Sequence, residues 1–432
     1  MFDEFITPIE FTAAGDTPEE QKTNLKIVKP SPGFEPSAEL VSESIIKDAD
    51  VTVLDYNPQQ VVVRFQIDGM WHSGAPMDRE SGDYLLATLK QLAGLDYKER
   101  RARQEGGFGT LFLKTRQKFK LVTQGIPSGE RVALYLDYKR PPLDTLEELG
   151  MRPTMLKSLQ PILNDTEMGL TLVTAVPGEG FTKVWRGVLD GCDRLTRDYF
   201  VLEEVGKLEP EVINIYPIEF DPAKGENAMS PVQQLLLKEP DVLAFTDLVD
   251  GDLVNQIVDL SVKKSIPMFT RLPGKHCVDA MLRVLLLKPD VRKFADRLTC
   301  VVAMRLIRLL CNDCKIGFQP HPSLVQKLGL PAGRVAELYK PFIFQPGMMD
   351  DQDQEIEPCS TCSGIGYRGR TGLFEMLTIN DEIREALVKT PRADQLGAIA
   401  KRHGHISMQM EGIVKVASGK TSIEELQRVL KS

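Results

Sequence analysis

Residues 169–182 read GLTLVTAVPGEGFT, and this stretch decides the fold expected for the larger part of the chain. Its first half, GLTLVTAV at residues 169–176, is a short apolar run, which is typical of a strand buried on both faces of a sheet. A glycine turn and a helical stretch follow the run. The stretch therefore predicts one strand and one helix of a parallel α/β sheet.

Three further apolar runs alternate with helical segments after this unit. They are VINIYPIEF at 212–220, DVLAFTD at 241–247 and SIPMFTRL at 265–272. Because strands that alternate with helices form parallel sheets covered on both faces, we expect an α/β domain over residues 151–303. We also expect a helix from Met304 to Lys315, which is rich in apolar residues and arginine, and helices throughout residues 376–432.

The N-terminal third of the chain has a different pattern. Residues 1–36 are polar and contain several prolines, which predicts a flexible tail. The runs VTVLDY (51–56) and VVVRFQIDG (61–69) alternate apolar and polar residues around NPQQ, which predicts a β-hairpin. We expect a small α+β domain over residues 37–140, with helices near residues 38–47 and 83–95. A linker containing the Pro-Pro pair is expected at residues 141–150.

The composition excludes several classes of protein. With 432 residues, of which 42% are hydrophobic and 26% charged, the chain is expected to be a soluble globular protein of two or three domains. It contains no apolar run of about 18 residues and no N-terminal secretory signal pattern, so a cytoplasmic location is expected. The net charge of −8 repels phosphate backbones, so nucleic acid is not expected as a partner.

Four of the seven cysteines form two C-x-x-C pairs, Cys311 with Cys314 and Cys359 with Cys362. Thiolates are soft ligands, and tetrahedral zinc binds four of them at about 2.3 Å. The glycines that follow the second pair suit the tight turns of a zinc knuckle; they are Gly364, Gly366 and Gly369. The pattern predicts one structural zinc ion.

Two other interpretations of these cysteines exist, buried thiols and a redox pair. A redox pair needs only one C-x-x-C motif, whereas two matched pairs favour a metal. The three remaining cysteines, Cys192, Cys277 and Cys300, are isolated in the sequence, and we expect them to be core or near-surface thiols.

The segments around the cysteines resemble a known family. RLIRLLCNDCK (305–315) and CSTCSGIGYRGRTGLFEML (359–377) resemble the zinc-binding segment of the secretion and pilus-assembly ATPases, the hexameric motors of type II secretion and type IV pili. VRFQIDG (63–69) and IPSGERVALYL (126–136) are similar to the second N-terminal domain of that family. HGHISMQMEGIVKVASGKTSIEELQRVL (403–430) is similar to its C-terminal helices. The resemblance covers about residues 45–432.

The resemblance implies a domain organisation, cofactors and partners. It implies a RecA-like P-loop-type domain over residues 151–303, a tetracysteine zinc subdomain over 304–375 and a C-terminal helical region over 376–432. It further implies ATP and magnesium as ligands beside the structural zinc. The implied partners are other subunits, in a homo-hexamer or a mixed ring with an active paralogue, and platform proteins of the inner membrane. The implied location is the cytoplasm or the inner face of that membrane.

The phosphate-binding motif departs from the family pattern. In the motif G-x-x-x-x-G-K-[ST] the lysine contacts the β- and γ-phosphates and the hydroxyl holds magnesium. The corresponding stretch is Ala175–Thr182, in which Phe181 takes the lysine position, Glu179 adds a negative charge and Pro177 removes an amide donor. Backbone amides at Gly178 and Gly180, with Thr182, remain as weak candidates for binding nucleotide. The alternative is a strand-to-helix turn that binds nothing.

The other nucleotide motifs of the family differ as well. Thr246-Asp247 stands where the family has a Gly-Glu pair after the Walker B strand, so Asp247 is the candidate catalytic carboxylate. The Glu-Asp-Pro segment aligns with Glu219–Pro222, and the histidine box aligns with Arg271–Lys275, where no histidine is in register. We interpret the chain as a divergent, non-catalytic or weakly active relative that serves as a structural or regulatory subunit. The alternative is a working ATPase with an altered phosphate loop.

Overall fold

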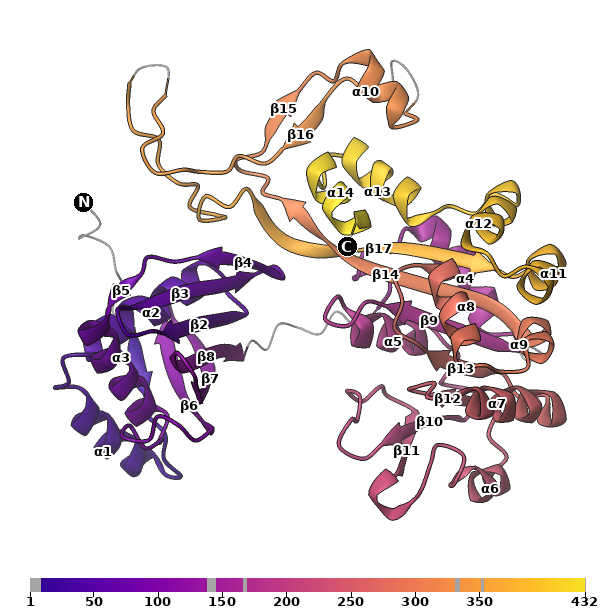
Figure 1. Cartoon of the computed structure of the whole chain (residues 1–432), viewed down its shortest axis with the longest axis horizontal. Coiled ribbons are helices and arrows are strands. Elements are labelled where there is room, and N and C mark those ends of the chain that lie inside the picture. The colour runs from indigo at the N-terminus through magenta and orange to yellow at the C-terminus, as the bar shows by residue number, and fades with distance from the viewer. Residues whose placement is uncertain (1–8, 138–144, 166–168, 331–334, 351–352, 432) are drawn as a thin grey trace. The chain divides into compact units, whose positions relative to one another are not determined.

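The computed structural model describes residues 9–137, 145–165, 169–330, 335–350 and 353–431 (Figure 1). The chain divides into two compact units, one made of residues 1–142 with 344–365 and the other of residues 143–343 with 366–432. Each unit has its own hydrophobic core, so each is described by itself.

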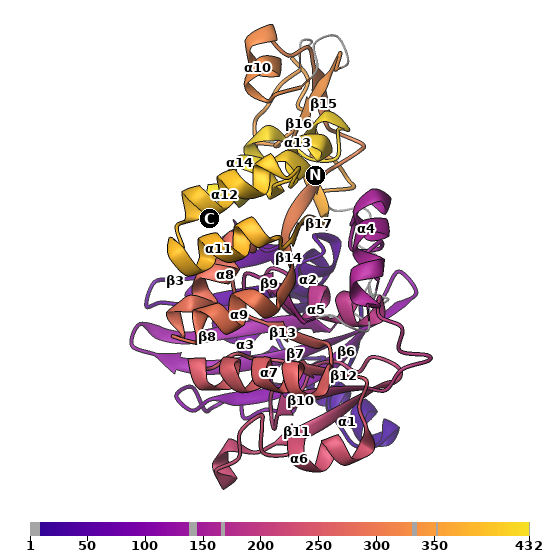
Figure 2. The same cartoon turned by 90° about the vertical axis from the view of Figure 1, so that its right-hand side faces the viewer.

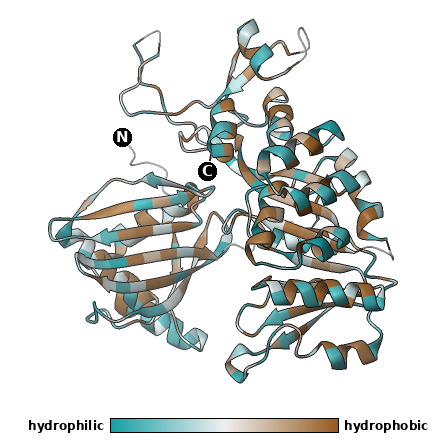
Figure 3. Ribbon diagram, turned by 45° about the vertical axis from the view of Figure 1, so that its right-hand side comes forward, coloured by the Kyte–Doolittle hydropathy of each residue, from teal (hydrophilic) through white to brown (hydrophobic). Residues whose placement is uncertain are grey.

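The first unit contains an antiparallel sheet. The order of its strands is β1-β6-β7-β8-β2-β3-β4, and β5 pairs with β3. The strands are β1 (Glu10–Thr12), β2 (Val51–Tyr56), β3 (Gln60–Ile67), β4 (Met70–Ser73), β5 (Met77–Asp78), β6 (Gln104–Phe112), β7 (Thr115–Ile126) and β8 (Gly129–Asp137). The helices are α1 (Pro18–Val28), α2 (Phe34–Ile46) and α3 (Arg79–Leu92). Buried and less buried residues alternate along β3, and Figure 3 shows apolar and polar residues alternating along this sheet. One face of the sheet therefore packs on the helices.

The hairpin prediction is confirmed, because β2 and β3 pair antiparallel from Val51 opposite Gln66 to Tyr56 opposite Val61. The prediction of a flexible tail over residues 1–36 differs from the structure. Within the described part, Phe11 on β1 is buried and its ring meets that of Phe34 edge to face at 5.4 Å. Helix α1 starts with a capping box in which the N-cap is Thr17. The sequence did not predict these elements, because the segment contains few apolar residues that could pack in a core and many polar ones.

The second unit contains a mostly parallel sheet. Its order is β11-β10-β12-β13-β9-β14-β17, with every pairing parallel except β14 with β17. Its strands are β9 (Leu170–Ala175), β10 (Tyr199–Glu204), β11 (Ile215–Phe220), β12 (Val242–Phe245), β13 (Met268–Arg271), β14 (Leu298–Leu310) and β17 (Tyr367–Thr378). The helices of the sheet domain are α4 (Pro153–Leu163), α5 (Phe181–Asp190), α6 (Val232–Leu235), α7 (Gly251–Lys264), α8 (Cys277–Leu286) and α9 (Val291–Arg297), with 3₁₀ turns η1 (Pro222–Lys224) and η2 (Leu236–Lys238). The predicted α/β class is confirmed.

Both faces of this sheet are covered, which explains why its strands are almost wholly apolar. On β9, Leu170 and Leu172 join the core beneath α7, α8 and α9, whereas Val173 and Ala175 join the core beneath α4 and α5. Figure 2 shows α7, α8 and α9 in front of the sheet. Alternate side chains of a strand point to opposite faces, so every position of β9 is buried.

The helix predicted from Met304 to Lys315 is wrong. These residues continue β14, which runs to Leu310 and pairs with both β9 and β17. A short apolar run with interspersed arginines fits either period, and only the two neighbouring strands select the extended form. Strand β10 was not predicted, although its apolar residues Tyr199–Leu202 are buried.

Helices were predicted throughout residues 376–432; residues 376–378 still belong to β17, and the helices begin at Asp381. These helices are α11 (Asp381–Lys389), α12 (Ala393–Arg402), α13 (Met408–Ala417) and α14 (Ile423–Lys431). Between the cysteine pairs lie β15 (Ile316–Phe318), α10 (Pro322–Lys327) and β16 (Leu338–Lys340). Of the linker predicted at 141–150, residues 141–144 lie outside the described residues. Leu146 and Leu149 are buried in the core beneath α4 and α5. No helix among the described residues is long and apolar enough to cross a membrane.

Candidate functional site

The loop between β9 and α5 has the strand-turn-helix form that the sequence predicted. Gly178 and Gly180 both have a positive φ, 80° and 89°, which glycine adopts without strain. A Cβ at Gly180 would lie 2.4 Å from the Cε of Met304 on β14, so the loop requires glycine there. Thr182 stands in the first turn of α5 and is half-buried. The structure thus brings Gly178, Gly180 and Thr182 together around one helix N-terminus.

The acidic residue of the loop is held by a neighbouring strand. Arg305 on β14 donates two hydrogen bonds to the Glu179 carboxylate, from Nε at 2.7 Å and from Nη2 at 3.1 Å. The Arg305 side chain is 3% exposed and that of Glu179 is 28% exposed. A bidentate hydrogen bond between a guanidinium and a carboxylate is among the stronger polar contacts in proteins. The carboxylate of Glu179 is therefore fixed within the loop.

The residue in the lysine position lies beneath an arginine. The guanidinium carbon of Arg271 lies 4.8 Å from the centre of the Phe181 ring and 5.6 Å from that of Trp185. Arg271 is the last residue of β13 and is 5% exposed. An arginine over aromatic faces is attracted by their π electrons. A positive charge of β13 thus lies over the residue that takes the lysine position.

Arg271 is itself engaged by polar partners. Its Nη2 lies 2.6 Å from a carboxylate oxygen of Glu209, and its Nε donates to the carbonyl oxygen of Thr246 at 2.6 Å. Thr246 directly follows β12. Arg271 therefore connects the strand ends of β12 and β13 with the start of α5.

Two carboxyl groups near Arg271 titrate abnormally. Burial raises the pKa of Asp247, and the positive charges of Arg271 and Lys207 oppose that shift. Burial raises the pKa of Glu203, the fifth residue of β10, to about 7, although the backbone N–H of Glu209 donates to it at 3.3 Å. A carboxyl group with a pKa near neutrality is common at functional sites.

Glu203, Glu209 and Arg305 were not among the residues predicted for this site. The available signal for Glu203 was an acidic residue directly after an apolar run, where a parallel strand ends. Glu209 and Arg305 gave no signal, since each contacts the site from an element that sequence spacing does not place there.

The predicted Glu-Asp-Pro segment has a structural role, and so has His276, which directly follows the segment aligned with the histidine box. The Glu-Asp-Pro segment was assigned to Glu219–Pro222, but Asp221 caps the turn η1 by accepting from the N–H of Ala223. Glu219 lies on the edge strand β11, opposite Glu203. His276 caps α8 by accepting from the N–H of Asp279 through Nδ1.

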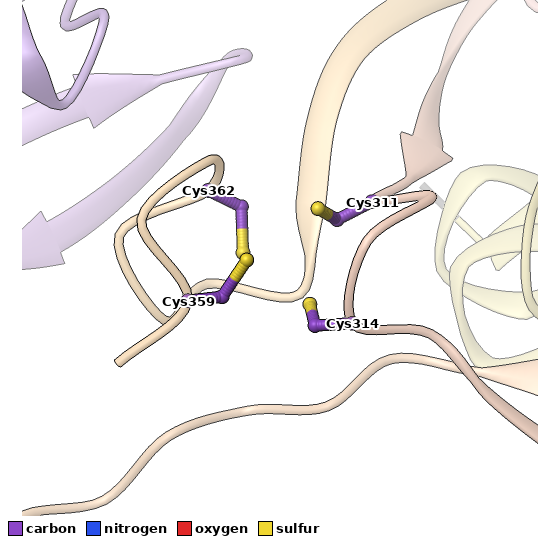
Figure 4. A group of neighbouring side chains, drawn as sticks. All are labelled: Cys311, Cys314, Cys359 and Cys362. Atoms are coloured by element: carbon purple, nitrogen blue, oxygen red, sulfur yellow. The ribbon is translucent and has the colours of Figure 1, made fainter. Parts of the chain in front are cut away.

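The two C-x-x-C pairs converge on one place. Cys311, Cys314, Cys359 and Cys362 each offer a sulfur, and the four sulfurs lie within 4.8 Å of one another (Figure 4). The N–H of Cys311 donates to the carbonyl oxygen of Gly366 at 3.0 Å. Four thiol ligands in such a group match the donor set of a structural zinc site.

The turns that follow the second pair are those that the sequence predicted. Gly364, Gly366 and Gly369 all have positive φ, between 78° and 79°. A Cβ at Gly366 would lie 2.7 Å from the carbonyl oxygen of Phe342, so this turn requires glycine. The remaining cysteines, Cys192, Cys277 and Cys300, are buried apart from the cluster, and burial raises the pKa of each thiol.

Comparison with known proteins assigns the chain to a family. The model of the type II/IV secretion system protein family matches residues 32–428. The type IV pilus assembly ATPase PilB of Thermus thermophilus is 23% identical over 390 residues, which are 90% of this chain and 42% of that protein. The type II secretion system protein E of Dickeya dadantii is 26% identical over 394 residues, which are 91% of this chain and 74% of that protein. The chain thus spans less than half of the first relative and about three quarters of the second.

Solved structures agree on the fold. The Legionella pneumophila ATPase DotB superposes with a TM-score of 0.55 at 11% identity, over 93% of this chain and 96% of that one. The Yersinia pseudotuberculosis ATPase DotB gives a TM-score of 0.52 at 12% identity, over 90% of this chain and 92% of that one. Because the family model matches nearly the whole sequence and the fold agrees, the chain belongs to the type II/IV secretion system protein family.

Proposed function

We propose that this chain is a non-catalytic or weakly active subunit of a type II secretion or type IV pilus machine. In this role it serves as a structural or regulatory part of a motor ring, as a homo-hexamer or in a mixed ring with an active paralogue. Its location is the cytoplasm, where it docks on platform proteins of the inner membrane.

The single observation that carries this proposal is the position of Phe181 under Arg271. Phosphoryl transfer depends on positioning and charge stabilisation, and the loop lysine supplies both at the β- and γ-phosphates. Here an aromatic ring occupies the lysine position, and the nearby guanidinium is engaged by Glu209 and by the carbonyl oxygen of Thr246. The second guanidinium beside the loop, that of Arg305, is engaged by Glu179. The guanidinium groups of Arg271 and Arg305 are thus each paired with a carboxylate of the same chain.

The tetracysteine cluster supports a structural role. We propose that Cys311, Cys314, Cys359 and Cys362 bind one zinc ion, which fixes the ends of the segment that contains β15, α10 and β16. Four protein ligands leave no open coordination position for water, so the metal stabilises the fold and takes no part in a reaction.

Nucleotide titration of the purified, zinc-loaded chain tests the proposal. With magnesium present, we expect no ATP binding at micromolar concentration and hydrolysis at least about 10³-fold below a typical turnover of 1 per second. Phe181→Lys combined with Glu179→Gly restores the lysine of the motif and removes the carboxylate of the loop. Leu237→Lys, at a position that is 83% exposed, is a control for nonspecific charge effects. Hydrolysis by the unmodified chain at an ordinary rate would overturn the proposal.

A second candidate function, an ATPase with an altered phosphate loop, is favoured by one observation. Asp247 lies where a Walker B carboxylate is expected, and Arg271 supplies a positive charge within reach of the start of α5. Magnesium-dependent hydrolysis that Asp247→Asn abolishes, while Asp252→Asn on α7 does not, would establish this function.

A further inference from the structure

A second polar site lies in the second unit, outside the phosphate loop. A cavity of about 670 Å³ is enclosed by the start of α8, the end of α10, strands β14 and β17, and helices α12 to α14. None of residues 175–182 lines it. Its basic and imidazole side chains come from five elements and loops; they are Lys275, His276, Arg305, Lys327, Lys401 and His405.

The cavity has only one carboxylate among its lining residues, and that group is already satisfied. Glu375 on β17 accepts from Nε2 of His405 at 3.1 Å and from the N–H of Met408 at 3.1 Å. The other ring nitrogen of His405 lies 3.0 Å from the carbonyl oxygen of Met376. The carboxylate of Glu375 is thus directed to His405 and to the backbone, away from the lysines.

The lysines of the cavity have no carboxylate partner. Lys275, Lys327 and Lys401 make no ion pair with any residue that the structure describes, and all three are exposed. Lysines that share one concave wall without an acid repel one another, and a bound anion relieves that repulsion. The cavity wall is therefore electropositive.

Two helix N-termini also lie at the cavity. Helix α8 begins after its N-cap His276, and Val278 of its first turn lines the cavity. Helix α13 begins after its N-cap Ser407, and Met408 lines the cavity. The N-terminal end of a helix carries about half a positive charge, which favours anions such as phosphate. At both ends a carboxylate of the chain already takes this place, because Asp279 accepts from the N–H of Lys275 at 2.8 Å and Glu375 accepts from that of Met408 at 3.1 Å. The three lysines therefore supply the positive charge that an added anion meets in this cavity.

The opposite part of the wall is apolar. Met410, Ile413 and Leu430 line it, and Met410 is 49% exposed. A pocket with a cationic side and an apolar side suits a ligand that has both an anionic group and an apolar group. We propose that this cavity binds a small organic phosphate, with its phosphate against the side chains of Lys275 and Lys401.

The geometry also connects this site with the phosphate loop. Arg305 lines the cavity and also donates two hydrogen bonds to Glu179 of the loop. An anion in the cavity competes with Glu179 for the Arg305 guanidinium.

Calorimetric titration of the zinc-loaded full chain with inorganic pyrophosphate tests the site. We expect Lys275→Gln and Lys401→Gln each to weaken binding at least about 5-fold, since each removes one cation from the phosphate. Lys389→Gln is the matched control, because Lys389 is 71% exposed on α11 and pairs with Glu385 outside the cavity. Lys183→Gln tests whether the pyrophosphate is bound at the start of α5 instead.

The outcomes separate the possibilities. Binding that is lost in the two cavity variants and kept in Lys389→Gln and Lys183→Gln supports the site. Absence of binding up to millimolar pyrophosphate, equal affinity in all variants, or loss of binding in Lys183→Gln alone overturns it. Sedimentation with phosphatidylglycerol vesicles then distinguishes the source of the phosphate. Vesicle binding that needs Lys275 and Lys401 identifies a lipid headgroup, and its absence beside intact pyrophosphate binding identifies a free ligand.

Discussion

Arg305 on β14 donates two hydrogen bonds, at 2.7 and 3.1 Å, to the carboxylate of Glu179 in the loop before α5. The two residues are 126 positions apart in the sequence. The two residues are brought together because Met304 lies opposite Ala175 in the parallel pairing of β14 with β9. The sheet thus places a buried guanidinium beside the first acidic residue after the loop strand.

Glu179→Gln should destabilise the second unit by about 1–3 kcal/mol, because it leaves the buried Arg305 guanidinium without its counter-charge. Urea unfolding monitored by the fluorescence of Trp185, which packs in the core beneath α4 and α5, measures the change. Glu204→Gln is the control: its partner Lys207 is 64% exposed, and an exposed pair contributes about 0–1 kcal/mol. Equal stability of Glu179→Gln and the unmodified chain would contradict a stabilising role for the pair.

The stability of the second unit should fall between about pH 4.5 and pH 7 because of Glu203. Burial raises the pKa of this carboxyl from 4.5 to about 7. Below pH 4.5 the carboxyl group is protonated in both the folded and the unfolded state, so it contributes no pH dependence to the free energy of unfolding there. As the pH rises, the unfolded state loses the proton first, so unfolding is favoured until the folded group also ionises near pH 7.

Glu203→Gln removes this dependence. The variant should gain about 1–3 kcal/mol over the unmodified chain at pH 8 and almost nothing at pH 4.5. Thermal unfolding at both pH values measures the difference, with Glu219→Gln on the edge strand β11 as the control. A difference between the two proteins that does not change with pH would show that Glu203 keeps an ordinary pKa.

Metal analysis should find about one zinc per chain. Cys359→Ser should lower that content and the thermal midpoint, because three remaining thiolates bind the metal more weakly. Cys192→Ser is the matched control, since Cys192 is buried beneath α5 and donates to the carbonyl oxygen of Val188 at 3.3 Å. Unchanged metal content in Cys359→Ser would exclude the four-cysteine site.

Lys90→Met should destabilise the first unit by up to about 3–5 kcal/mol, because it removes the nearer cation of the buried Glu130 carboxylate, and Arg100, at 3.9 Å, compensates the charge only in part. The Lys90 and Glu130 side chains are 0% and 2% exposed, and their charged atoms lie 2.6 Å apart. Lys90→Met with Glu130→Gln should recover much of the loss, since no charge then remains buried. Lys47→Met, which removes a half-exposed pair with Glu43, should cost less than about 1 kcal/mol. A double variant as unstable as the single one would contradict this account.

Several features were predictable from the sequence because short patterns determine them. Apolar runs such as GLTLVTAV could be recognised as strands buried on both faces without knowledge of the strands that pair with them. The β2–β3 hairpin followed from its alternation, and the zinc-type cluster followed from two matched cysteine pairs. The family resemblance rested on the same local stretches.

The predictions that were wrong concern segments whose structure depends on contacts with residues far away in the sequence. The stretch RLIRLL fits a helix or a strand, and pairing of β14 with β9 and β17 makes it a strand. The elements before residue 37 exist because Phe11 and Val28 find a core made by later strands and helices. The prediction for that segment rested only on its polar composition.

The sequence by itself determined that Phe181 replaces the loop lysine and that Glu179 adds a negative charge, since both facts are residue identities. Only the tertiary structure decided where the compensating positive charges lie, on β13 at Arg271 and on β14 at Arg305. The physical reason is that a parallel sheet brings the ends of distant strands to one edge, where charges meet that no local pattern connects.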